Sequence, residues 1–285
     1  MKVLINFADE KFRFNQKINS FTGKYIGGFD KVIEYSPADI DKVFYEKNKQ
    51  ILETKRGVGL WLWKPYFILK TLNTLNEEDV LFYCDAGSLF LRNISFLTKE
   101  MQKQKLNIFI SFTPHISKNW TRKYVFDFLK INSEEYYNTL QPCAGYILLK
   151  KNKFSEDFVK EWLELCQNFD LIRDVTQGEE NFIEFKDHRH DQSLLAIIAK
   201  KKQLEYYRDI SQFGNEPFYY ETFTYTNLPP KKWNFKGQYP NIILLYRSGG
   251  LLKSIIMYFF KLFIYSINKK LYYKLASLKL SIIKK

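Results

Sequence analysis

A carboxylate that ends an apolar run is the first candidate for chemistry in this chain. Residues 80–83 are apolar, Cys84 follows, and Asp85-Ala86-Gly87 closes the run. An open α/β sheet delivers such an acid to the carboxyl edge of a strand, where ligands bind. Asp85 is therefore predicted to bind a divalent cation or the ribose of a nucleotide, with Gly87 allowing close backbone approach. The alternative is a strand-ending aspartate that caps the next turn.

A basic and aromatic segment precedes this strand. It begins at Arg56 and reads RGVGLWLWKPY. Pro65 favours the first turn of a helix, which places Trp63 and Lys64 at a helix N-terminus, where anions bind. Arg56 and Lys64 suit a diphosphate. Trp61 and Trp63 offer flat faces to a base or a sugar, or else anchor the core. The pattern indicates a nucleotide-sugar enzyme.

A polar cluster stands before a later apolar segment, where the chain reads DHRHDQSLL from Asp187. His188 and His190 are two residues apart and do not share a helix face, which disfavours a zinc-protease site. Asp191 and Gln192 are predicted to contact sugar hydroxyls or to act at the reacting carbon, with His190 beside them. The alternative has Asp187 or Asp191 as a helix N-cap, with both histidines in solvent.

Small residues open another predicted strand. Cys143 leads into Ala144 and Gly145, and an apolar run follows. The two small residues allow a bulky ligand close to the backbone. Together with His188, they are assigned to the sugar or acceptor pocket.

The elements that must position these residues alternate along the chain. This alternation predicts an α/β fold with a mostly parallel sheet covered by helices on both faces. An irregular segment at 211–240, rich in Tyr, Phe, Pro, Asn and Gly, is predicted to pack over a site. The predicted strands are 2–8, 31–35, 79–84, 107–111 and 144–149, and the predicted helices are 38–53, 64–75, 119–130, 154–168 and 190–201.

Chain length limits the number of domains, and cysteine usage indicates the cellular compartment. The 285 residues can form one large α/β domain with an appended tail. Three widely spaced cysteines without a CxxC pair favour a reducing compartment. Asp9 and Glu10 arrive before an apolar region of sufficient length, so the start predicts a first strand rather than a signal peptide. A cytoplasmic protein is expected.

The charge is unevenly distributed. Twelve positive charges of the net +13 follow Glu221, and no acid occurs there. This asymmetry predicts an anionic partner for the tail, either membrane or nucleic acid. The chain is divided into a catalytic domain, 1–248, and a tail, 249–285. Uncharged runs in the tail are too short to span a bilayer, so a basic amphipathic helix pair on an anionic leaflet is predicted. The alternative is a terminal helix packed on the body.

Together these blocks resemble bacterial glycosyltransferases of the GT-A fold that build O-antigen lipopolysaccharide and capsular polysaccharides. The likeness spans roughly residues 1–210 and includes the W-x-W-K-P run. The matching blocks are Phe82-Tyr83-Cys84-Asp85-Ala86-Gly87, Cys143-Ala144-Gly145-Tyr146 and His190-Asp191-Gln192-Ser193-Leu194-Leu195. The resemblance implies a GT-A-like (Rossmann-type) fold and transfer of a hexose from a UDP-sugar to a lipid-linked or polysaccharide acceptor. The basic, apolar tail suits an enzyme with a lipid-linked acceptor, so a peripheral position on the cytoplasmic face of the inner membrane is expected, without a nucleic-acid partner.

The resemblance also implies roles on the donor side. Phe7 and Ala8 would lie near the uracil, and Asp85 would bind the metal or the ribose. Arg56 and Lys64 would hold the diphosphate. The remaining donor contacts would come from Trp63, Ala86 and Gly87.

One departure from the family pattern concerns the metal. Gly87 replaces the second acid of the D-x-D motif, so Asp85 alone remains for Mn²⁺ or Mg²⁺, and pyrophosphate and water would supply the other ligands. Without a metal, Arg122 or Lys123 would join the named cations in neutralising the leaving UDP. Asp191 would act as catalytic base in an inverting enzyme or as charge stabiliser in a retaining one.

Two other classes of function remain open at this point. A nucleic-acid-binding protein is compatible with the charge and the aromatic content, but the basic excess lies in the apolar tail rather than on a polar face. Another nucleotide-dependent transferase or a metal hydrolase could use Asp85 and the two histidines. The chain has no P-loop and no recognisable metal triad.

Overall fold

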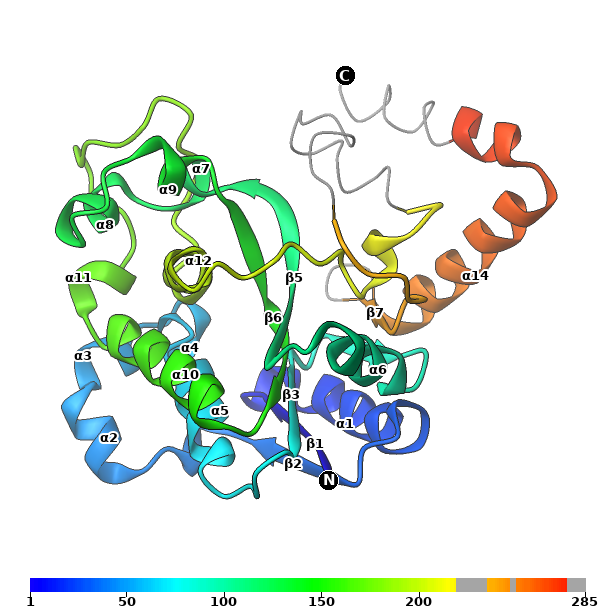
Figure 1. The fold of residues 1–285 in the computed structure, drawn as a ribbon, viewed down its shortest axis with the longest axis horizontal. Coiled ribbons are helices and arrows are strands. Elements are labelled where there is room, and N and C mark those ends of the chain that lie inside the picture. Colours follow the sequence, from blue (N-terminus) through cyan, green and yellow to red (C-terminus); the bar gives the residue numbers. More distant parts are fainter. Residues whose placement is uncertain (219–234, 247–249, 276–285) are drawn as a thin grey trace.

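A computed structural model describes residues 1–218, 235–246 and 250–275 (Figure 1). A five-stranded sheet forms its centre, in the order β2-β1-β3-β6-β5, and a small second sheet pairs β4 with β7. The strands are β1 (Lys2–Phe7), β2 (Lys31–Tyr35), β3 (Val80–Cys84), β4 (Ser88–Phe90), β5 (Ile108–Ile116), β6 (Leu140–Lys150) and β7 (Ile243–Leu245).

Strand direction in the central sheet is mixed. β1 pairs in parallel with β2 and with β3, whereas β6 is antiparallel to both β3 and β5. β1, β2, β3 and β5 therefore run the same way, and β6 alone runs against them. The predicted α/β sheet with mostly parallel strands is confirmed, and the antiparallel β6 is an addition that the sequence pattern does not reveal.

Helices cover both faces of the central sheet (Figure 1). α5 (Trp63–Leu72), α10 (Lys153–Cys166) and α12 (Asp191–Lys201) lie on one side, and α1 (Arg13–Thr22) and α6 (Ser95–Gln104) lie on the other. The shorter helices are α2 (Lys42–Lys47), α3 (Lys49–Leu52), α4 (Gly57–Leu60), α7 (Ser117–Trp120), α8 (Lys123–Phe128), α9 (Glu134–Tyr137) and α11 (Phe169–Ile172). α14 (Leu251–Ile267) lies apart from the sheet.

Two hydrophobic cores follow from the alternation of side chains along each strand. Ile5 and Tyr83 belong to the core beneath α5, α10 and α12. Leu4 and Phe82, one residue earlier in each strand, belong to the core beneath α6. Because neighbouring side chains of a strand point to opposite faces, a sheet covered on both sides needs such unbroken apolar strands.

The predicted elements exist, but two predicted helices are interrupted. Residues 38–53 form a 3₁₀ turn followed by α2 and α3, which are separated at Asn48, whose side-chain amide donates to the Phe44 carbonyl at 2.8 Å. Asparagine competes in this way with the helical hydrogen bonds of the backbone. Residues 119–130 divide into α7 and α8 at Thr121, which is extended. Of the predicted irregular segment, residues 219–234 lie outside the described residues.

A left-handed turn precedes α5. All five residues from Gly57 to Trp61 have positive φ, including Val58 at 53° and Leu60 at 52°. Such values are uncommon for side chains with a Cβ, and rarest for a β-branched residue such as valine. The indole nitrogen of Trp63 donates to the Gly57 carbonyl at 3.0 Å and ties the turn to the helix. Strained backbone of this kind clusters at functional sites.

Gly59→Ala should lower the free energy of unfolding by more than about 2 kcal/mol. The cost of placing alanine in a left-handed conformation and the cost of a steric overlap add together. Gly59 has a φ of +92°, and an added Cβ would lie 2.8 Å from the Leu52 Cα. Gly178→Ala is the matched control, since Gly178 has a φ of +80° and nothing within 4 Å of an added Cβ. Urea unfolding measures both variants. Equal losses would show that the overlap at Gly59 relaxes freely.

α14 packs on the body through one side only. Tyr258 is buried and its ring lies 5.2 Å from that of Phe218, stacked at 12°. Other apolar side chains of the helix are exposed, including Leu252, Phe259 and Phe263. Within the part of the chain that the structure describes, no helix has the length and apolar character needed to cross a bilayer.

Candidate active site

Two adjoining pockets gather the predicted residues at the carboxyl edge of β1 and β3. The first, named here the α12 pocket, has a volume of about 350 Å³. Its lining includes nine of the predicted residues: Arg56, Lys64, Asp85, Ala144, Gly145, His188, His190, Asp191 and Gln192.

The second, named here the β1 pocket, has a volume of about 450 Å³. Asp85 and Trp61 line both pockets, so Asp85 stands where they meet. The other predicted residues in the lining of the β1 pocket are Phe7, Ala8, Trp63, Ala86 and Gly87.

Lys64 lies between two carboxylates at this junction. Its ammonium nitrogen is 2.8 Å from Asp191 Oδ2 and 3.9 Å from Asp85 Oδ1. The Tyr83 hydroxyl also donates to Asp85. Burial raises the pKa of the Asp191 carboxyl, and Lys64 opposes that rise. Lys64 and Asp191 are both buried, and buried charges persist only when they are paired.

Each of these charges is delivered by a different element. Lys64 is the second residue of α5, Asp85 follows the last residue of β3, and Asp191 is the first residue of α12. Backbone contact brings β6 into the same place, because the Asp85 N–H donates to the Gly145 carbonyl at 2.8 Å. A Cβ at Gly145 would lie 3.2 Å from Asp85 Oδ2, so glycine leaves room for the carboxylate.

The two histidines are buried, which contradicts the alternative of solvated rings. His188 Nε2 donates to the Leu171 carbonyl at 2.9 Å, and its Nδ1 accepts from the Arg122 N–H at 3.4 Å. His190 Nδ1 donates to the Ile172 carbonyl at 2.7 Å. Burial lowers the pKa of both rings, so both are neutral. Their hydrogen bonds go to backbone groups, and catalytic or sugar contacts for either ring stay predictions.

Gln192 belongs to a chain of amides beside β6. Its Oε1 accepts from the Ala144 N–H at 3.4 Å, and its Nε2 donates to Gln141 Oε1 at 3.0 Å. Gln141 in turn donates to Thr121 Oγ1 at 3.0 Å. This chain fixes the side chain of Gln192 at the pocket wall.

Arg56 is already paired with acids. Its guanidinium donates to Asp187 at 2.7 Å and also to Asp174. The two carboxylates use two of the five N–H donors of this half-exposed side chain. A diphosphate at Arg56 would therefore share the guanidinium with these carboxylates or replace them.

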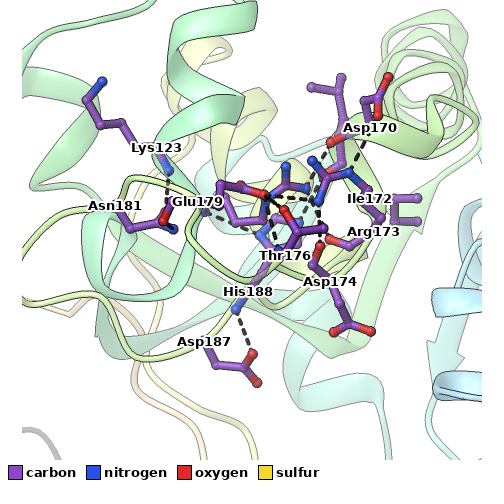
Figure 2. A network of polar contacts seen from close by, with 12 residues as sticks. Lys123, Asp170, Ile172, Arg173, Asp174, Thr176, Glu179, Asn181, Asp187 and His188 are labelled. Carbon is purple, nitrogen blue, oxygen red and sulfur yellow. Dashed lines mark hydrogen bonds and ion pairs between the residues drawn. The ribbon is translucent and has the colours of Figure 1, made fainter.

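Arg122 serves the fold rather than the pocket. It is fully buried, its Nε donates to Glu179, and one of its terminal nitrogens donates to the Asp170 carbonyl at 2.9 Å. Figure 2 shows the surrounding network, in which Glu179, Arg173 and Thr176 converge. The suggestion that Arg122 neutralises a leaving diphosphate is therefore not supported by its position.

Lys123 is likewise placed away from both linings. It pairs with Asp127 at 3.0 Å and with Glu180 at 3.8 Å. These exposed pairs lie on α8 and on the loop before α12.

The two tryptophans of the basic segment were predicted either to face a ligand or to anchor the core, and their positions differ. Trp63 is 5% exposed and its ring stacks on Phe7, with centroids 3.8 Å apart, so it is a core anchor that also borders the β1 pocket. Trp61 is half-buried and lines both pockets. The left-handed turn is what turns Trp61 toward them.

Sequence reasoning missed several pocket residues. Lys11 and Lys55 are exposed and line the β1 pocket, while Trp120 and Arg189 line the α12 pocket. Lys55 directly precedes Arg56 in sequence, and this position beside the basic segment could have identified it as a pocket residue. Trp120 carries no such signal, because a tertiary contact with the start of α12 brings it to the site.

The residues around Asp85 do not form a protein cation site. Asp85 offers one carboxylate, and that carboxylate faces the Lys64 ammonium and the Tyr83 hydroxyl. Among residues 1–218, 235–246 and 250–275, no three His, Cys, Asp or Glu side chains are arranged to hold an ion.

Comparison with known proteins gives remote likenesses. No family model and no curated protein matches the chain. Mouse xyloside xylosyltransferase 1, in its apo form, is 10% identical with a TM-score of 0.48, over 89% of this chain and 99% of that one. Apo GlyE, a glycosyltransferase of Streptococcus pneumoniae TIGR4, is 14% identical with a TM-score of 0.41, and the alignment covers 87% of this chain and 55% of GlyE. The galactosyltransferase LgtC, in complex with donor and acceptor sugar analogs, is 11% identical with a TM-score of 0.41, over 87% and 88% of the two chains.

Proposed function

We propose that this protein is a glycosyltransferase that uses a nucleotide-sugar donor. The observation that carries the proposal is the carboxylate pair Asp85 and Asp191, bridged by Lys64, where two pockets of ligand size meet. One pocket suits a nucleoside and the other a sugar with its acceptor. The reacting carbon of a donor that spans both would lie at the junction.

The β1 pocket is proposed to hold the nucleotide, with uridine as its base. Phe7 is the last residue of β1 and Ala8 follows it, and both line this pocket. Lys11 and Lys55 line the same pocket as exposed ammonium groups, which places mobile positive charge near a diphosphate. Asp85 then accepts hydrogen bonds from ribose or sugar hydroxyls.

The charge at the junction fits glycosyl transfer. The bond between the anomeric carbon and the diphosphate oxygen breaks, and its electron pair leaves with UDP. An acceptor hydroxyl forms the new bond and loses its proton. The transition state resembles an oxocarbenium ion. Two carboxylates and one ammonium leave one net negative charge beside it, which stabilises that cation electrostatically. The same electrostatic stabilisation applies whether the enzyme inverts or retains the configuration at the anomeric carbon.

The proposed acceptor is lipid-linked or polysaccharide, the transferred group is a hexose, and the setting is bacterial surface glycan synthesis, such as O-antigen or capsule. Peripheral attachment to the cytoplasmic face of the inner membrane is part of this proposal. It is supported by α14, whose exposed apolar side chains stand among Lys253 and Lys261, with no acid in the helix. A basic helix with an apolar exposed side binds an anionic lipid surface.

The membrane proposal predicts binding to anionic vesicles. The double variant Phe259→Glu and Phe263→Glu should reduce partition into phosphatidylglycerol vesicles at least about tenfold, because two exposed aromatic side chains that would insert into the lipid surface become carboxylates. Phe128→Glu, at an exposed phenylalanine of α8, is the control and should bind as the unmodified protein does. Vesicle co-sedimentation measures all three. Equal binding by the double variant would exclude α14 as the contact.

The test of the function is release of UDP from a panel of UDP-sugars, with Mn²⁺ or with EDTA, using the full chain in detergent. Slow hydrolysis of one donor identifies the class of enzyme and the donor together. Loss of hydrolysis in EDTA would show that Asp85 with phosphate and water suffices for a metal. Absence of turnover, together with absence of UDP binding by calorimetry, would contradict the proposal.

A further inference from the structure

We propose that Trp120 and Arg189 form an acceptor subsite for a sugar that carries an anionic group, either a carboxylate or a phosphate. This rests on the glycosyltransferase function proposed above and names the chemical class of its acceptor. It concerns the wall of the α12 pocket to which the sequence analysis assigned no role.

The position of these residues places them on the acceptor side. Trp120, Arg189 and Thr113 line the α12 pocket, and they are not part of the β1 pocket lining. The two pockets share Trp61 and Asp85. A donor whose nucleotide fills the β1 pocket reaches the junction at Asp85, and the wall beyond that point faces the incoming acceptor.

Arg189 is the cation of this pocket without a carboxylate partner. Arg56 is paired with Asp187, and Lys64 is paired with Asp191. Among residues 1–218, 235–246 and 250–275, no carboxylate forms an ion pair with the Arg189 guanidinium, although Asp187 lies near enough to act on its charge. Its Nε is buried without a hydrogen-bond acceptor. The Nε itself is closed to a ligand, but the terminal nitrogens of the guanidinium are not buried in this way, and an anionic group in the pocket would bind them with charge-assisted hydrogen bonds.

Two cationic side chains lie close to the ring of Trp120. The guanidinium carbon of Arg189 lies 4.2 Å from the centroid of its indole, and Lys186 Nζ lies 5.7 Å from the same ring. The His115 ring is 4.9 Å away. Burial, together with the nearby Arg189 and Lys186 charges, lowers the pKa of His115 to about 3, so His115 stays neutral. An aromatic surface next to an arginine fork suits a sugar ring that bears a carboxylate or a phosphate.

The subsite is preorganised by backbone contacts. The Trp120 carbonyl accepts from the Arg189 N–H at 3.2 Å and from Ser193 Oγ at 2.6 Å. Ser193 Oγ also accepts from the Arg189 N–H at 3.0 Å. The end of α7 is thereby fixed against the start of α12. A ligand that binds there gains affinity because little ordering remains to be done.

The test compares three monosaccharide probes on the full chain at constant ionic strength: methyl glucuronide, glucose 6-phosphate and methyl glucoside. Tryptophan fluorescence and calorimetry report their affinities without any donor. We expect at least tenfold tighter binding of one acidic probe than of the glucoside, and the two acidic probes distinguish carboxylate from phosphate. Arg189→Gln should abolish this preference. Lys160→Gln removes an exposed charge from α10 as a control and should retain it.

Two outcomes would overturn the subsite: equal binding of acidic and neutral probes, and a preference that survives Arg189→Gln. If the surviving preference comes with a tenfold loss of UDP affinity, Arg189 lies on the donor diphosphate instead. Because these measurements need no turnover, a preference for acidic sugars in a protein that neither hydrolyses a UDP-sugar nor binds UDP would support the subsite while contradicting the proposed function.

Discussion

Lys64→Met should lower the free energy of unfolding by about 3–5 kcal/mol at neutral pH, the cost of removing one partner from a buried ion pair. The side chains of Lys64 and Asp191 are 4% and 5% exposed, with 2.8 Å between the charged atoms. Methionine fills the volume of the lysine stem but leaves Asp191 without its cation. Urea unfolding gives the difference directly. A loss below about 1 kcal/mol would mean that water or another cation reaches Asp191.

The same variant has a defined pH dependence. Burial raises the folded-state pKa of Asp191, so folding takes up a proton, and stability falls as pH rises from about 4 through that raised pKa. Without Lys64 nothing opposes the effect of burial, so the deficit of the variant should be small near pH 4 and should grow as pH rises through the raised pKa of Asp191. Lys153→Met is the control, because Lys153 pairs with Asp157 on the exposed face of α10 and should change little at any pH. A deficit independent of pH would point to packing rather than charge.

Asp191→Asn should reduce the rate of sugar transfer per folded molecule by about 10²–10³-fold, since it removes preorganised negative charge from the transition state, and it should also lower stability because Lys64 loses its 2.8 Å partner. The asparagine has the same shape, and Lys64 keeps Asp85 at 3.9 Å as a partner. UDP release under saturating donor measures the effect, and unfolding curves confirm the fold. Asp157→Asn, an exposed acid of α10, should be fully active. Turnover of Asp191→Asn at the unmodified rate would remove this carboxylate from the mechanism.

The strands and the long helices could be predicted from the sequence because apolar periodicity is a local property. β2 was predicted with its observed bounds, and α10 and α12 within one or two residues. β4 and β7 were missed. Each has only three residues, and each gains its hydrogen bonds from the other across more than 150 residues of sequence. α1 was also missed, since its mean character is polar and only Gln16 and Asn19 are buried on it.

The composition of the site could be predicted better than its electrostatics. Asp85 and Asp191 were recognised by their places at the end of a strand and the start of a helix. Lys64 was assigned to a diphosphate from its type and its position at a helix N-terminus. Its actual carboxylate partners come from β3 and α12, which only the tertiary fold brings within reach. Sequence spacing contains no information on such pairings.

The bridge between Lys64, Asp85 and Asp191 also bears on how the protein comes together. The three charges belong to α5, β3 and the start of α12, which lie as many as 127 residues apart in sequence. A partly assembled chain without α12 would leave the Lys64 ammonium without its 2.8 Å carboxylate, in a place where hydration is lost. Such intermediates are penalised, so the catalytic centre and the domain should form and dissolve in a single cooperative step. Activity would then serve as a direct reporter of the folded fraction.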